Sequence, residues 1–234
     1  AQAIRFLERA TAANQSLRSL DDARELISKA TTLKAAIDAL LQQGSDLLAA
    51  GALVRPKGEN SAERFQQVLA TDPDNPAALQ AMLGISQRVL LQGQQLMDTG
   101  ELAAVDELVA DAASVGVSVS VVEQLRTGVT NERQRLQTVA ELLAQGLELF
   151  NNGLLTEPSK SNAVMVLRNV QQLDPGNGPA QALLRRCAER LVEVAVEARR
   201  FGLLADADQC LALALSIQSD APEWIELQRQ WQRS

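Results

Sequence analysis

The pattern Asp-Pro-x-Asn occurs twice in the sequence, and the two copies lie 102 residues apart. The first copy runs from Asp72 to Asn75 and the second from Asp174 to Asn177, each between an apolar run and an alanine-rich segment. The residue before a proline avoids the α region, so Asp-Pro ends a helix, and asparagine is a favoured N-cap for the next one. The pattern therefore marks a helix end and a helix start at equivalent points of a repeated unit.

The chain aligns with itself without a gap when it is shifted by these 102 residues. The aligned pairs include residue types that shape the backbone: Gly44 and Gly146, Gly51 and Gly153, Pro56 and Pro158, Gly100 and Gly202. Self-similarity at a fixed period is typical of a stacked array. The period predicts a tail of a preceding, truncated unit at 1–25, a first unit at 26–127, and a second unit with a C-terminal helix at 128–234. On this interpretation the chain is a piece of a longer protein.

Apolar residues within each unit recur at i, i+3, i+4 and i+7, the spacing of an amphipathic helix. The aromatic content is only 3%, while leucine and alanine are abundant, which favours helix over strand. We therefore predict an all-α fold of about ten helices. The main ranges are about 17–50, 61–71, 76–99, 102–114, 118–151, 162–173, 178–201, 204–216 and 221–232.

These residues resemble the tetratricopeptide repeat (TPR), which pairs two antiparallel helices with small residues at their crossing and a proline after the second helix. In the first unit the matching residues are Leu40, Gly44, Leu47, Gly51, Ser61, Phe65, Val68 and Asp72. Their copies are Leu142, Gly146, Leu149, Gly153, Ala163, Leu167, Val170 and Asp174. A second motif pairs Gly93, Leu96, Gly100, Val105, Val109 and Ala112 with Ala195, Ala198, Gly202, Ala207, Leu211 and Ala214. The resemblance implies a TPR-like α-solenoid of two tandem four-helix units, although the loops after Gly51 and Gly153 and the first helices are longer than in the family.

The composition argues against several kinds of chemistry. The sequence has no histidine, so it offers no imidazole base and no histidine-ligated metal. Its net charge of −7 disfavours binding to a nucleic-acid backbone, which needs a basic stripe. Its apolar runs are far shorter than the roughly 20 residues that span a bilayer. We therefore predict no catalytic residue, no cofactor, no metal site, no nucleic-acid partner and no direct membrane insertion.

The two cysteines, Cys187 and Cys210, align with the apolar residues Ile85 and Leu108. In a helix hairpin that turns near Gly202 they are out of register by about seven residues, or roughly 10 Å. That separation exceeds the reach of a disulfide. We predict two free thiols that are largely buried.

Tetratricopeptide arrays are adaptors that bind peptides or assemble complexes, and the resemblance implies a concave binding surface here. Some members grip a carboxylate with lysine and asparagine, but the matching positions hold no cation: Leu41, Ser45, Leu90, Gln94, Leu143, Leu147, Val192 and Val196. The groove is therefore expected to be apolar and to suit a partner's amphipathic helix or the chain's own long helices.

The candidate protein-binding residues are Leu147, Val196, Arg200, Trp224 and Trp231. Arg200 belongs to a small basic cluster, interpreted as a solvated face or as a contact for an acidic partner. Trp224 and Trp231 share one helix face, which packs on the preceding helices, packs on a segment outside the chain, or forms a partner-binding hot spot.

The sequence thus predicts a non-catalytic, TPR-like scaffold or adaptor region that mediates protein–protein interaction. The style of the sequence, rich in alanine, leucine and glutamine, favours a larger bacterial protein. The alternative is a structural spacer or self-association module. Both a cytoplasmic and a periplasmic location remain open.

Overall fold

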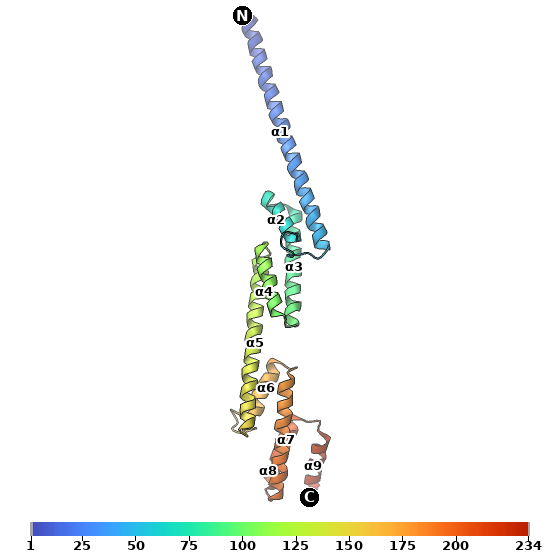
Figure 1. Cartoon of the computed structure of the whole chain (residues 1–234), viewed down its shortest axis with the longest axis vertical. Coiled ribbons are helices and arrows are strands. Elements are labelled where there is room, and N and C mark those ends of the chain that lie inside the picture. Colours follow the sequence, from blue (N-terminus) through green and yellow to red (C-terminus); the bar gives the residue numbers. More distant parts are fainter. Residues whose placement is uncertain (1, 234) are drawn as a thin grey trace. The chain divides into compact units, whose positions relative to one another are not determined.

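The computed structural model describes the backbone of residues 2–233 and the side chains of residues 5, 9, 11–15 and 19–233. All regular secondary structure in this range is helical, as predicted, and comprises nine helices (Figure 1). Their bounds are α1 Gln2–Ala49, α2 Ser61–Thr71, α3 Pro76–Asp98, α4 Leu102–Ser114, α5 Val119–Asn151, α6 Ala163–Leu173, α7 Gly178–Arg200, α8 Leu204–Ile217 and α9 Pro222–Arg233.

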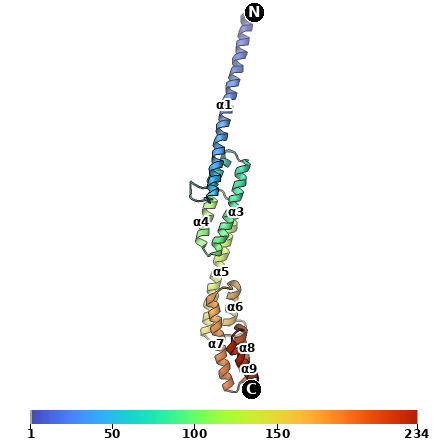
Figure 2. The same cartoon turned by 90° about the vertical axis from the view of Figure 1, so that its right-hand side faces the viewer.

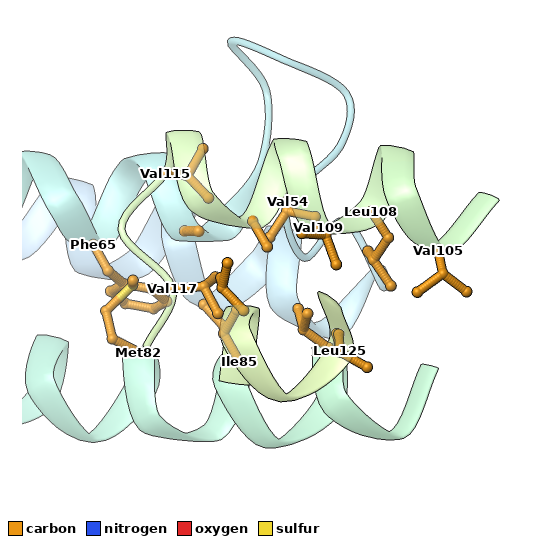
Figure 3. Close-up of a cluster of buried hydrophobic side chains, with 14 of the residues drawn as sticks. Val54, Phe65, Met82, Ile85, Val105, Leu108, Val109, Val115, Val117 and Leu125 are labelled. Atoms are coloured by element: carbon orange, nitrogen blue, oxygen red, sulfur yellow. The ribbon is translucent and has the colours of Figure 1, made fainter. Parts of the chain in front are cut away.

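The chain divides into two compact units, an N-terminal unit of residues 1–130 and a C-terminal unit of residues 131–234. The core of the N-terminal unit joins α2, α3, α4 and the first turns of α5, and the end of α1 packs against it (Figure 3). Its largest wholly buried side chains include Phe65, Ile85, Val105 and Leu125.

The C-terminal unit has its own core, formed mainly by α6 and α7. Leu167, Leu184 and Leu191 are buried there, and Phe150 of α5 and Trp224 of α9 pack against the cluster. Each unit therefore buries apolar side chains from consecutive helices in a core of its own.

Asparagine side chains begin four of the helices, where the sequence predicts helix starts. The Oδ1 atoms of Asn60 and Asn162 accept the N–H groups of Glu63 and Met165, both at 2.9 Å. Two further asparagines, Asn75 and Asn177, cap the helices that follow the Asp-Pro pairs. These side chains satisfy backbone N–H groups that have no partner within the helix.

Two pairs of helices have bounds that differ by 102 residues at both ends. Helices α2 and α6 have 11 residues each, and α3 and α7 have 23 residues each. Helices α4 and α8 begin 102 residues apart, at Leu102 and Leu204. The loops after α1 and α5 each contain a cis peptide bond before the aligned prolines.

The structure differs from the prediction of about ten helices at the N-terminus. Helix α1 begins at Gln2 rather than near Leu17 and continues without a turn to Ala49. In the aligned segment Gly116, with φ +70°, ends the turn after α4, whereas Asn14 stands at the equivalent position of α1. Since no glycine or proline precedes Gly44, nothing in the sequence breaks the helix there.

Candidate protein-interaction surfaces

Helix α5 begins with an apolar face that docks on the α3–α4 hairpin. This docking face consists of Val122, Leu125 and Val129, all buried in the N-terminal core. Leu125 lies so close to Gly93 that a Cβ on this glycine would be 2.4 Å from the Leu125 Cδ2. Gly128 on the same turn approaches the Met97 sulfur, which would be 2.9 Å from a Cβ. The two helices therefore approach closely here, and a side chain larger than glycine at position 93 or 128 would require Leu125 or Met97 to shift.

Helix α9 carries an aligned docking face of Trp224, Leu227 and Trp231. Trp224 packs on the C-terminal core, and the Arg199 guanidinium lies 4.7 Å from the centroid of the Trp231 ring. The same guanidinium donates to the Trp231 carbonyl at 3.3 Å. Both tryptophans therefore pack on the helices that precede them, while their role toward a partner stays a prediction.

Helix α1 carries the third aligned docking face, formed by Leu20, Ala23 and Ile27. Leu20 is 53% and Ile27 67% exposed. Every side chain described between residues 19 and 36 is exposed, and this part of α1 extends away from the other helices of the N-terminal unit in both views (Figure 2). The same apolar face is thus covered on α5 and α9 and open on α1.

The remaining candidate binding residues lie on two helices of the C-terminal unit. Leu147 on α5 is 44% exposed, Val196 on α7 is half-buried, and Arg200 at the end of α7 is exposed. Phe201, which follows Arg200, is 81% exposed, in a turn where the N-terminal unit has Thr99. The role of these residues in binding also stays a prediction.

A hollow of about 420 Å³ separates the loop before α6 from α8. Its lining includes Thr156, Asn162, Arg168 and Leu213. Arg168 spans one side by donating to the Ser216 carbonyl at 3.1 Å. The hollow is shallow and mixed in polarity, and no acid, base and nucleophile converge in its lining.

The two thiols are free, as predicted. Cys187 is buried, and burial raises the pKa of its thiol to about 11. Cys210 is only half-buried, so the prediction that it is largely buried holds less well; burial also raises the pKa of its thiol. Neither environment promotes the thiolate needed for nucleophilic chemistry.

Sequence reasoning missed the exposed docking face of α1, although the signal was present. Leu20 and Ile27 align with Val122 and Val129 at the same 102-residue shift that aligns the rest of the sequence with itself. The face was overlooked because residues 1–25 were assigned to a separate tail, which splits the face between two segments.

In the part of the chain that the structure describes, no three histidine, cysteine or carboxylate side chains are grouped so that they could hold a metal ion. Within the same residues no helix is both long and apolar enough to cross a membrane. No protein-family model, curated protein or solved structure matches this chain.

Proposed function

We propose that the chain is a segment of a TPR-like scaffold that binds other proteins through contacts between a helix and a helix hairpin. One observation carries the proposal: three aligned copies of the docking face exist, and the copy on α1 is open. A face that packs on a helix hairpin in α5 and in α9 is expected to bind a hairpin through its copy on α1 as well.

The repeat architecture belongs to the same proposal. We infer two tandem units of period 102, stacked as in an α-solenoid, with a long helix opening each unit. The equal lengths of α2 and α6 and of α3 and α7, together with the aligned asparagine caps, support this inference. An array of this kind exposes surfaces between its repeats and at its ends, where protein partners bind.

The exposed apolar side chains of α1 are in keeping with a protein partner. Burying one leucine or isoleucine side chain contributes about 1.5–3 kcal/mol. Leu20, Leu26, Ile27 and Leu33 are all between 49% and 67% exposed. Large apolar side chains that gather on one exposed helix are typical of an interaction site, whereas isolated ones are ordinary surface.

The alternative function, a structural spacer, is favoured by the geometry of α1. The 18 residues from 19 to 36 form uninterrupted helix with exposed side chains. At 1.5 Å per residue this stretch spans about 27 Å. A helix of that kind sets a distance even if nothing binds to its sides, so the test must ask whether the apolar face is contacted.

Site-specific photo-crosslinking in the cells that make the protein tests the proposal. A photoreactive side chain at position 20 or 27 is expected to crosslink to one recurrent protein, and the same side chain at Asn14 or Thr32, on the opposite side of α1, is not. Crosslinks at all four positions, or at none, would favour the spacer.

A further inference from the structure

We propose that the docking face of α1 binds the α7–α8 hairpin of a second copy of the chain, in the place that α9 occupies within one copy. The inference rests on the proposed function and names the partner. The juxtaposition is between Leu20, Ala23 and Ile27 of one chain and the buried side of α7 and α8 around Ala195 of the other.

The α1 face has the layout of the α5 face that docks within the chain. The three positions have the same spacing in both helices, and an ion pair flanks each face at aligned positions. In α1 the Arg24 Nη1 lies 3.3 Å from the Asp21 Oδ1, and in α5 the Arg126 Nη1 lies 2.8 Å from the Glu123 Oε1. Helix α1, whose face is open, therefore has the same face spacing and the same flanking ion pair as α5, whose face is docked.

The acceptor side is also built alike in the two hairpins. Four buried positions align between α3–α4 and α7–α8: Gly93 with Ala195, Val105 with Ala207, Val109 with Leu211, and Ala112 with Ala214. Each is a small or aliphatic residue, so both hairpins present an apolar acceptor. Because α5 already occupies the α3–α4 hairpin, the α7–α8 hairpin is the aligned acceptor that an α1 helix could bind.

Side-chain sizes at the central contact favour α1 over α9 as the closest fit. On α3 the acceptor is Gly93, which leaves room for Leu125, and that leucine is 1% exposed. On α7 the aligned residue is Ala195, which adds a methyl group. The α9 leucine at this position, Leu227, is only half-buried, whereas α1 supplies the smaller Ala23.

The fit of α9 is loose along its length. None of its described residues is fully buried, and Trp224, Leu227 and Trp231 are all half-buried. A helix held this way can be exchanged for a better-fitting one. A second contact of the α5 face has a counterpart as well. Gly128 of α5 meets Met97 of α3, and the residues aligned with them are Leu26, which is 67% exposed, and Arg199. A leucine can cover the aliphatic part of an arginine side chain.

Because the donor face and the acceptor are different surfaces, the contact is head-to-tail. Helix α9 is joined to α8 by only four residues, 218–221, and competes with the second copy as an intramolecular ligand. The chain is therefore expected to associate at high protein concentration, and weakening the hold of α9 is expected to promote association.

Sedimentation velocity on the full chain over a range of concentrations provides the test. The double variant Trp224→Asp/Trp231→Asp, called acceptor-open, should associate at a protein concentration at least about tenfold lower than the unchanged chain, since it removes an intramolecular competitor. Adding Leu20→Asp/Ile27→Asp should restore the monomer. The matched control Asn14→Asp/Thr32→Asp adds the same charge on the opposite side of α1 and should leave association unchanged.

A mixing experiment separates head-to-tail docking from pairing between two α1 helices. The quadruple variant, with an open acceptor and a blocked face, should not associate with itself but should form a complex with the unchanged chain. Failure to do so while the acceptor-open variant still associates would overturn the inference. If circular dichroism shows that acceptor-open is unfolded, Trp231→Ala replaces it, since it removes only the ring over which Arg199 lies.

The two proposals fail in different ways. Acceptor-open and Trp231→Ala chains that stay monomeric at every concentration overturn the inference, and crosslinks from positions 20 and 27 to another protein would then leave the proposed function standing. Crosslinks from these positions to a second copy of the chain support both.

Discussion

The two units differ where the loop before the second helix of each, α2 or α6, meets the fourth helix, α4 or α8. In the N-terminal unit Arg55 bridges the loop to α4, with bonds to Asp111 and, at 3.3 Å, to Glu107. The hydrogen bond that Arg55 donates to the Asp111 carboxylate raises the pKa of Arg55. In the C-terminal unit the aligned residues are Glu157, Leu213 and Gln209, which form no such bridge, and the hollow of about 420 Å³ lies on that side.

This difference separates two classes of residue. Those that recur at 102 residues, such as Asn60 and Asn162, act on the backbone: they start helices and tie loops. Those that differ, such as Arg55 and Glu157, act on the surface. The helix starts at Asn60 and Asn162 are therefore capped alike in the two units, whereas Arg55 and Glu157 make different surface contacts.

The largest effect is expected from filling the helix crossing in either unit. A Cβ on Gly44 would lie 2.9 Å from the Phe65 ring, and one on Gly146 would lie 2.8 Å from the Leu167 Cδ2. Gly44→Leu and Gly146→Leu should each destabilise their unit by roughly 1–3 kcal/mol, because overpacking forces the helices apart. Thermal unfolding measures the effect, and a neutral result in one unit alone would break the equivalence of the two crossings.

Matched controls come from positions with free space. Nothing lies within 4 Å of a Cβ on Gly84, in the middle of α3, so Gly84→Leu should raise the melting temperature slightly through helix propensity. Asp98→Ala and Arg200→Ala change exposed residues at the ends of α3 and α7 and should leave it nearly unchanged.

The next largest effect is expected at the buried asparagine caps. Asn60 and Asn162 accept a helix N–H and also donate to the carbonyls of Pro56 and Pro158 at 3.0 Å. Asn60→Ala and Asn162→Ala should each cost about 0.5–2 kcal/mol in unfolding free energy, since the helix N–H groups and loop carbonyls lose their partners. Asn→Asp keeps the cap acceptor but places a buried carboxylate oxygen beside the Pro56 or Pro158 carbonyl, so it should cost at least as much as Asn→Ala at both sites; chemical denaturation checks the order.

Much of the fold could be predicted from the sequence because its helix ends are determined by residues that act on the neighbouring backbone. Asp72, Asn75 and their copies act on neighbouring backbone, so their positions sufficed to place α2, α3, α6 and α7 within a few residues. The continuity of α1 was not foreseen, since it depends on the absence of a stop at Asn14 rather than on a signal. The exposure of Leu20 and Ile27 depends on whether a helix hairpin packs beside α1, and no local sequence pattern indicates such a tertiary contact.

A smaller effect is expected from removing the Arg55 bridge, which distinguishes the loop at 52–60 from the loop at 154–162. Arg55→Ala removes the bridge to Asp111 and Glu107, and should speed amide hydrogen exchange in residues 52–60 while costing at most about 1 kcal/mol, because the ion pairs are exposed. The aligned change Glu157→Ala should leave exchange in residues 154–162 unaltered. Equal acceleration in both loops would show that the bridge is not what distinguishes them.

The smallest effect concerns an ion pair that α5 has and α1 lacks. Arg135 donates to Glu132 at 2.6 Å and to the Leu173 carbonyl at the end of α6 at 2.9 Å, whereas the aligned residues in α1 are Leu33 and Ala30. The hydrogen bond from Arg135 lowers the pKa of Glu132, which outweighs the opposing effects of burial and of Asp174.

Because the folded pKa of Glu132 lies below its ordinary value of 4.5, the stabilisation is present above that value and is lost as the pH falls through the lowered pKa. Glu132→Gln should therefore be less stable than the unchanged chain at pH 7, by about 0.5 kcal/mol for this half-buried pair that solvent still screens, and equally stable once the carboxyl is protonated. Comparing the two proteins cancels the titration of all other carboxyl groups. Hydrogen exchange in α6 reports the loss within the C-terminal unit, and exchange in α2 serves as the internal control, since no such pair faces it. A stability difference that persists unchanged at low pH would mean that Glu132 acts through packing rather than through its charge.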